Sequence, residues 1–143
     1  MDCMVVDNPS NTSLEFNLFE DSQFKDEGGK TLEHCECCFY PIDDTKWLGF
    51  LEIKDCKPKH IATYREKAKQ QLISTVAIFK KEGLCPNHQL VYGIISYPRR
   101  NKTSFNEYIF GDVIEQTRLK RKYGINFMAT NNIKVDKDRI LSK

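Results

Sequence analysis

The stretch LGFLEIK, residues 48–54, reads as a buried strand whose last residues change from apolar to charged. Its aliphatic and aromatic residues suit a strand. Glu52 and Lys54 stand two residues apart, so their side chains leave on the same face. A charge on a central strand has a desolvation cost unless it is paired or binds a metal ion. A Glu–Lys pair on a solvated edge strand would explain the pattern equally well.

The residues before this stretch predict the other strand of a hairpin. Thr31–Ile42 is rich in β-branched, aromatic and cysteine residues, residues 43–46 (DDTK) form a turn, and Trp47–Cys56 returns as the second strand. With the turn centred on Asp44, residues whose numbers sum to 88 lie opposite each other. The pairs predicted on one face are Glu36 with Glu52, His34 with Lys54, and Cys38 with Phe50.

The two faces of this hairpin differ. One is predicted to be apolar core, with Cys35, Cys37, Phe39 and Pro41 against Trp47, Gly49, Leu51 and Ile53. The other brings Glu36 and Glu52 to about 5 Å from each other, where like charges repel unless a cation lies between them. Carboxylate oxygens are hard ligands of the kind that Mg²⁺ prefers. The hairpin therefore predicts a metal site at the end away from the turn.

The rest of the chain predicts one α/β domain over residues 1–143. The expected elements are a helix from His60 to about Glu82, a buried strand at Leu90–Tyr97, a helix from Phe105 to about Tyr123 capped by Ser104, and a strand at Ile125–Ala129. Leu14–Phe24 fits a strand or a short helix. Residues 1–12 are expected to be a loose arm and residues 131–143 a basic tail. A hairpin followed by helix-strand-helix-strand predicts a mixed sheet with helices packed on it.

The Glu52-Ile53-Lys54 motif and this order of elements resemble the PD-(D/E)XK nuclease superfamily, which is restriction-endonuclease-like. The resemblance covers roughly residues 14–130 as a pattern of elements. It implies that Glu36 and Glu52 bind Mg²⁺ (or Mn²⁺), that the Ile53 carbonyl is an additional ligand, and that Lys54 orients the attacking water. The first acid is usually Asp in that superfamily; Asp44 is excluded because eight strand residues, about 26 Å, separate it from Glu52.

Further side chains could support such a site. Many relatives carry a Gln-x-x-x-Tyr motif on the following helix, and this chain has Gln71 with Thr75 at the Tyr position. Gln71 is also explained as a polar residue at the flank of the helix. His34 could be a second ligand, a base or a hydrogen-bonded residue. An extra carboxylate could come from Glu15, Glu20 or Asp21, of which Glu20 is preferred.

Charge suggests a polyanionic partner. Residues 1–44 hold 11 acidic and two basic residues, a balance of −9, whereas the remainder is basic. Candidate nucleic-acid contacts are Arg99, Arg100, Lys102, Arg118 and Arg121. Folding could equally mix both charges over the surface, and basic residues at a helix end are also explained by the helix dipole.

These observations predict a cytoplasmic, Mg²⁺-dependent endonuclease acting on DNA, without a membrane span or signal peptide. The six cysteines are expected to be reduced, small buried residues, with a zinc site as the weaker reading. The alternative function is a non-catalytic interaction, immunity or accessory protein whose acidic N-terminal third docks onto a basic partner. A protein partner or a homodimer is compatible with either function.

Overall fold

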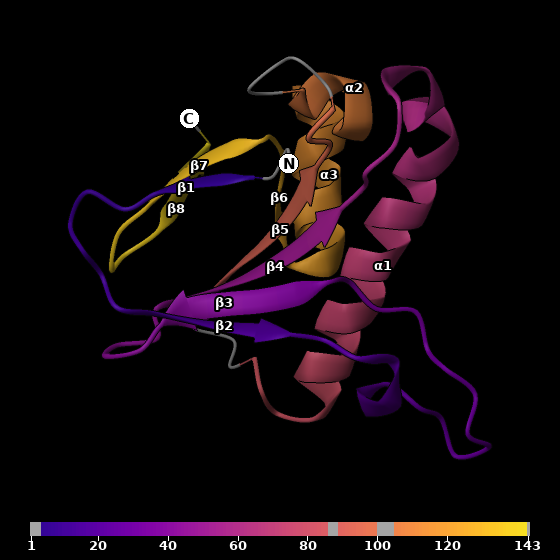
Figure 1. The fold of residues 1–143 in the computed structure, drawn as a ribbon, viewed down its shortest axis with the longest axis horizontal. Coiled ribbons are helices and arrows are strands. Elements are labelled where there is room, and N and C mark those ends of the chain that lie inside the picture. Colours follow the sequence, from indigo (N-terminus) through magenta and orange to yellow (C-terminus); the bar gives the residue numbers. More distant parts are fainter. Residues whose placement is uncertain (1–3, 86–88, 100–104, 143) are drawn as a thin grey trace.

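A computed structural model describes residues 4–85, 89–99 and 105–142 as one α/β domain with two sheets (Figure 1). The five-stranded sheet has the order β2 (Leu14–Leu18), β3 (Cys37–Pro41), β4 (Trp47–Ile53), β5 (Leu90–Ser96) and β6 (Asn126–Ala129). The smaller sheet holds β1 (Val5–Asp7), β7 (Asn132–Val135) and β8 (Ile140–Ser142). The helices are α1 (Ile61–Lys81), α2 (Asn106–Phe110) and α3 (Val113–Tyr123), with short 3-10 turns η1 (Asp21–Gln23) and η2 (Pro58–His60).

The larger sheet is mixed, as predicted. Strands β2, β3 and β4 are antiparallel, and β4, β5 and β6 are parallel. The predicted hairpin register is confirmed within the strands, because Cys37 pairs with Leu51, Cys38 with Phe50 and Phe39 with Gly49. The α1 crossover connects β4 to the adjacent parallel β5, so β4 becomes the central strand of the sheet.

Two apolar clusters cover the two faces of this sheet. On one face, Phe50 and Ile95 pack with Leu72 of α1 and with Ile109 and Phe110 of α2. On the other face, Phe39 and Trp47 pack with Ile133 and Val135 of β7 and with Ile140 of β8. The molecule thus has three layers, with the helices on one side of the large sheet and the small sheet on the other (Figure 1). Both faces of the hairpin are core, whereas the sequence predicted this of one face alone.

The first strand of the hairpin is shorter than predicted. The expectation was Thr31–Ile42, but β3 begins at Cys37 and the chain bends at Glu36. The backbone just before the bend bonds to α1 instead of to β4: Cys35 N–H donates to the Thr75 hydroxyl over 2.8 Å. The bend also interrupts side-chain alternation. Cys35 consequently lies in the helix-side cluster, and its predicted place beside Cys37 is wrong.

The helix predicted from Phe105 to Tyr123 is divided into α2 and α3. Gly111 ends α2 with a φ of 84° and a ψ of −164°, a backbone conformation that glycine adopts readily and other residues rarely do. Asp112 then caps α3 by accepting a hydrogen bond from the Glu115 N–H over 2.9 Å. The predicted cap, Ser104, lies outside the described residues.

The expected loose arm and basic tail contain strands. Val5–Asp7 forms β1, which pairs in parallel with β7, and residues 132–142 hold the β7–β8 hairpin. Leu14–Leu18, left open between strand and helix, is strand β2. Among the described residues, no helix is long and apolar enough to cross a membrane.

Candidate functional site

A cavity of about 480 Å³ opens where the β3–β4 hairpin ends away from its turn. It brings together five side chains that the sequence singled out: His34, Glu36, Glu52, Lys54 and Gln71. Asp21, from η1, lines it as well. The hairpin supplies Glu36 and Glu52, and α1 covers one side through Gln71. Predicted residues from three separate segments therefore share one cavity.

Glu52 is the most buried charged residue described in the chain, at 2 % exposure. It lies on the central strand β4, opposite Ile95 of β5. Its Oε2 atom is 2.8 Å from Lys54 Nζ. Burial raises the pKa of Glu52 above its usual value, opposed by the hydrogen bond and charge of Lys54 and reinforced by the charge of Glu36. The ion pair therefore offsets only part of the cost of burying this carboxylate.

Glu36 lies beside Glu52, as predicted, although the two are not an ideal cross-strand pair. The backbone N–H of Glu36 donates to the Leu51 carbonyl over 3.0 Å. In the β3–β4 ladder Leu51 pairs with Cys37, so the hydrogen bond of Glu36 is shifted by one residue from that register. A hydrogen bond from the same backbone segment also lowers the pKa of Glu52. The Glu36 side chain is exposed. One carboxylate is thus fixed in the core, and the other is exposed at the same cavity.

His34 is held on both ring nitrogens. Nδ1 lies 2.8 Å from the Cys35 carbonyl and Nε2 lies 2.7 Å from Asp21 Oδ1, while the ring stacks on Phe24 at 4.4 Å between centroids. Burial by itself would lower the pKa of His34, but the Cys35 carbonyl and Asp21 together raise it above its usual value. Both neighbours are acceptors, which suits an imidazolium that donates twice. Of the three roles left open for His34, this geometry favours the hydrogen-bonded one.

Two side chains of α1 hold the bend that carries these groups. Thr75 accepts the Cys35 N–H and donates to the Gln71 carbonyl over 2.7 Å. Gln71 donates from Nε2 to the His34 carbonyl over 3.3 Å. The Gln71 Oε1 atom is buried, and no described residue donates to it. The sequence placed Gln71 toward the site but gave Thr75 no role, since a threonine inside a helix carries no signal of its own.

Of the three candidates for an extra carboxylate, Asp21 lines the cavity, whereas Glu15 and the preferred Glu20 are not among its lining residues. Asp21 lines the cavity through its contact with His34. Glu20 instead occupies the cap of η1, where its backbone N–H donates to Gln23 Oε1 over 2.8 Å and its carbonyl accepts from the Gln23 N–H over 3.0 Å. Glu20 and Asp21 are adjacent, and which of them faces the cavity depends on where η1 begins. The spacing of residues in the sequence does not give that starting point.

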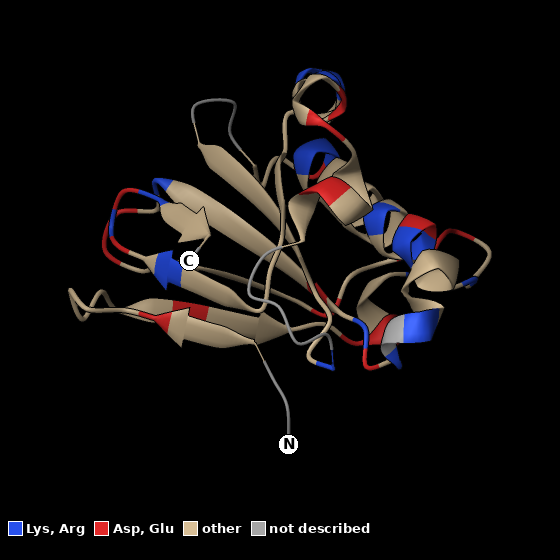
Figure 2. Cartoon of the chain, turned by 90° about the horizontal axis from the view of Figure 1, so that it is seen from above, with Lys and Arg blue, Asp and Glu red and all other residues tan. Residues whose placement is uncertain are grey.

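The predicted basic residues that the structure describes, Arg99, Arg118 and Arg121, are not among the residues lining the carboxylate cavity. Arg99 donates to Asp55 over 2.7 Å, just beyond Lys54. Arg118 and Arg121 are exposed on α3, and Arg100 and Lys102 lie outside the described residues. Basic residues predominate on the two longer helices: α1 carries five against one acidic residue, and α3 carries four against one (Figure 2). The two longer helices thus keep an excess of positive charge, and the charges are not evenly mixed along them.

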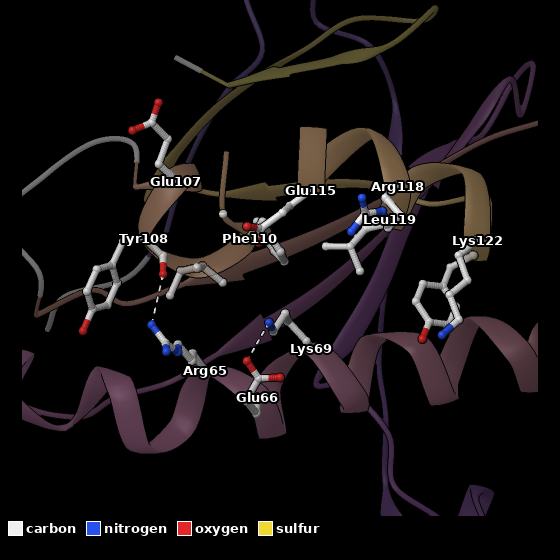
Figure 3. Close-up of a pocket in the computed structure, with 13 residues that line it drawn as sticks. Arg65, Glu66, Lys69, Glu107, Tyr108, Phe110, Glu115, Arg118, Leu119 and Lys122 are labelled. Atoms are coloured by element: carbon white, nitrogen blue, oxygen red, sulfur yellow. Dashed lines mark hydrogen bonds and ion pairs between the residues drawn. The ribbon is translucent and has the colours of Figure 1, made fainter. Parts of the chain in front are cut away.

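Arg118 lines a second cavity, a groove of about 520 Å³ between α1 and the α2–α3 segment (Figure 3). Arg65 donates across the groove to the Tyr108 carbonyl over 3.4 Å, and Lys69 pairs with Glu66 at 2.7 Å along the α1 wall. Acidic and basic side chains alternate along its walls. The groove therefore lacks the single-sign surface that a phosphate backbone would favour.

The residues fit a magnesium ion of low protein coordination. Mg²⁺ is commonly held by one or two carboxylates and completes its shell with water and substrate phosphates. Glu36 and Glu52 supply such a pair, and the buried Gln71 Oε1 needs a donor that a hydrated ligand in this cavity would provide. Within the described ranges, no group of three or more His, Cys, Asp or Glu side chains is placed to hold a metal.

The cysteines fit the structural expectation better than a zinc site. Cys35 and Cys38 lie in the apolar cluster on the helix side of the sheet, whereas Cys37 lies in the cluster on the other side, so these three thiols do not converge on one site. The described cysteines are all free.

Comparison of the chain with protein-family models, with curated proteins and with solved structures found no match.

Proposed function

We propose that the protein is a metal-dependent nuclease that hydrolyses phosphodiester bonds of DNA at the Glu36–Glu52–Lys54 cavity. One observation carries the proposal: a nearly fully buried carboxylate on a central strand, Glu52, adjoins an ammonium and a second carboxylate in an open cavity. A stable fold does not require this arrangement, because an apolar residue at position 52 would avoid the desolvation cost. A carboxylate in a cleft whose pKa is shifted by burial and by a specific charge partner is a candidate functional group.

The order of elements supports the same proposal. An antiparallel hairpin, a helix and a parallel strand, with the acidic motif on the second hairpin strand, is the pattern on which the resemblance to PD-(D/E)XK nucleases rests. The bend at Glu36 and the end of β4 place both acids at one end of the sheet. Glu36 fills the position where that superfamily usually has Asp.

Each side chain has a definable task in this proposal. Glu36 and Glu52 would hold Mg²⁺, which supplies Lewis-acid stabilisation of charge on the phosphoryl group. Lys54, already directed at Glu52 Oε2, would hold the attacking water by hydrogen bonding. Gln71 and Thr75 would keep the Glu36 bend in place through the backbone of residues 34–35. His34, when protonated, would reduce the repulsion between the carboxylates.

The test is cleavage of supercoiled, linear and single-stranded DNA with Mg²⁺, Mn²⁺ or a chelator. Glu52→Gln keeps the size of the side chain but removes its charge, so cleavage should fall at least about 100-fold. Lys54→Ala should abolish cleavage yet leave Mg²⁺ affinity, measured by calorimetry, within a few-fold, because an ammonium is not a metal ligand. Glu66→Gln is the matched control, since Glu66 also pairs with a lysine, on the surface of α1.

Cleavage that survives the chelator, or that Glu52→Gln leaves unchanged, would contradict the site. If the wild type neither binds Mg²⁺ nor cleaves any of these substrates, the interaction-protein alternative takes its place.

A further inference from the structure

The outer edge of β2 is a self-complementary strand, and we propose that two copies of the chain pair there, antiparallel, to form a continuous ten-stranded sheet. Strand β2 is the terminal strand of the five-stranded sheet, with β3 on one side. The inference concerns assembly and does not rest on the nuclease proposal.

The hydrogen-bond pattern shows which backbone groups face outward. Ser13 C=O accepts from the Ile42 N–H, and Phe19 N–H donates to the Glu36 carbonyl, so the odd-numbered residues of this segment bond toward β3. The N–H and C=O groups of Leu14, Phe16 and Leu18 therefore point to the open edge. Among the described residues, none bonds to these groups. Such a row of unpaired groups is a template for another strand.

The side chains of this edge are apolar and exposed. Leu18 is 78 % exposed and Phe16 is 50 % exposed, although Phe16 stacks on Phe39 at 5.1 Å. Leu84, also exposed, lines an apolar cavity of about 790 Å³ along the same edge with both of them. Monomeric proteins usually protect an edge strand with lysine, proline or a bulge. Strand β2, with the sequence LEFNL, has none of these.

The sequence of β2 fits a second copy of itself in one register. A two-fold axis at Phe16 places Phe16 opposite its own copy and Leu14 opposite Leu18, so the apolar side chains of both copies lie in one row on one face. The same register places Glu15 opposite Asn17, which avoids a contact between like charges. Centring the axis on Leu14 or Leu18 instead would shorten the pairing. The partner that this edge fits best is therefore a second copy of the chain.

Sedimentation of the full chain at about 100 µM tests the association, and a dimer mass is expected, with a dissociation constant of about 10 µM or tighter. Leu18→Lys should weaken the dimer at least about tenfold, because it brings a charge into the apolar row. Val113→Lys is the matched control: Val113 is 73 % exposed on α3, and its substitution should leave the dimer mass unchanged. A wild type that sediments as a monomer at this concentration overturns the proposal.

Disulfide trapping tests the register. In a Cys3→Ser, Cys56→Ser background, Phe16→Cys should give a covalent dimer under mild oxidation, because directly opposed Cα atoms of a hydrogen-bonded antiparallel pair lie about 5.5 Å apart. Leu14→Cys and Leu18→Cys should each stay monomeric under reducing-agent-free denaturing electrophoresis, whereas their mixture should cross-link. A dimer in which Phe16→Cys does not cross-link uses another surface, and this outcome also overturns the proposal.

Discussion

Two glutamate–lysine pairs of this chain have almost the same geometry and opposite surroundings. Glu52 and Lys54 meet at 2.8 Å at the end of β4, and Glu66 and Lys69 meet at 2.7 Å on α1. The Glu52 side chain is 3 % exposed, whereas that of Glu66 is 69 % exposed. Solvent screens the second pair, so it contributes little. The first pair carries a desolvation cost that its contact does not fully offset.

The two pairs differ in the desolvation cost of their glutamates: it is small for the exposed Glu66 and large for the buried Glu52. Helix residues three apart meet routinely, and α1 would fold without Glu66. Glu52 stands where the neighbouring residues of β4 are apolar and buried. The N–O distance of an ion pair therefore does not distinguish the two sites. The burial of the Glu52 carboxylate is the feature that supports a functional role for its cavity.

The largest difference is expected on removing each lysine. Lys54→Ala leaves Glu52 buried without its counter-charge and should lower the free energy of unfolding by about 3 kcal/mol. Lys69→Ala should change it by less than about 0.5 kcal/mol. Urea denaturation at pH 7, with chelator present so that no cation replaces the lysine, measures both. Equal effects of the two substitutions would remove the distinction between the pairs.

An intermediate difference is expected for two threonines with the same local hydrogen bond. Thr75 donates to the Gln71 carbonyl over 2.7 Å and Thr117 donates to the Val113 carbonyl over 2.8 Å, each to the residue four positions before. Thr75 also accepts the buried Cys35 N–H, which Thr75→Val would leave unpaired. That loss should cost about 1–3 kcal/mol, whereas Thr117→Val on exposed α3 should be near neutral. Thermal denaturation of both variants decides whether α1 holds the bend.

The smallest effect is a dependence on pH. The pKa of Glu52 is raised in the folded protein, so the folded state favours the protonated form. The stability associated with this proton is fully present below the unfolded pKa and is lost as pH rises through the folded pKa. Glu52→Gln should therefore become more stable relative to the wild type between pH 4 and pH 7. Glu66→Gln should show no such trend in parallel denaturation curves, and a common trend would refute the assignment to burial.

The sequence by itself was sufficient for the α/β class, the mixed sheet and the hairpin register. Turn residues and alternating apolar residues are local signals, and the turn at Asp44 fixes which residues face each other. The register in turn brought Glu36 and Glu52 to one end of the hairpin. One local signal was misleading: the pattern of residues 105–123 predicted one helix, and Gly111, at a positive φ, divides it.

Only the tertiary structure decided which residues complete the cavity and how deeply Glu52 is buried. Asp21 reaches His34 across 13 positions, and Thr75 reaches Cys35 across 40, so neither contact has a signature within a sequence window. The small sheet depends on β1 meeting β7 from the other end of the chain. Burial is a property of every segment packed around a residue, and the charge of Glu52 acquires its cost only when β5 and α1 close over it.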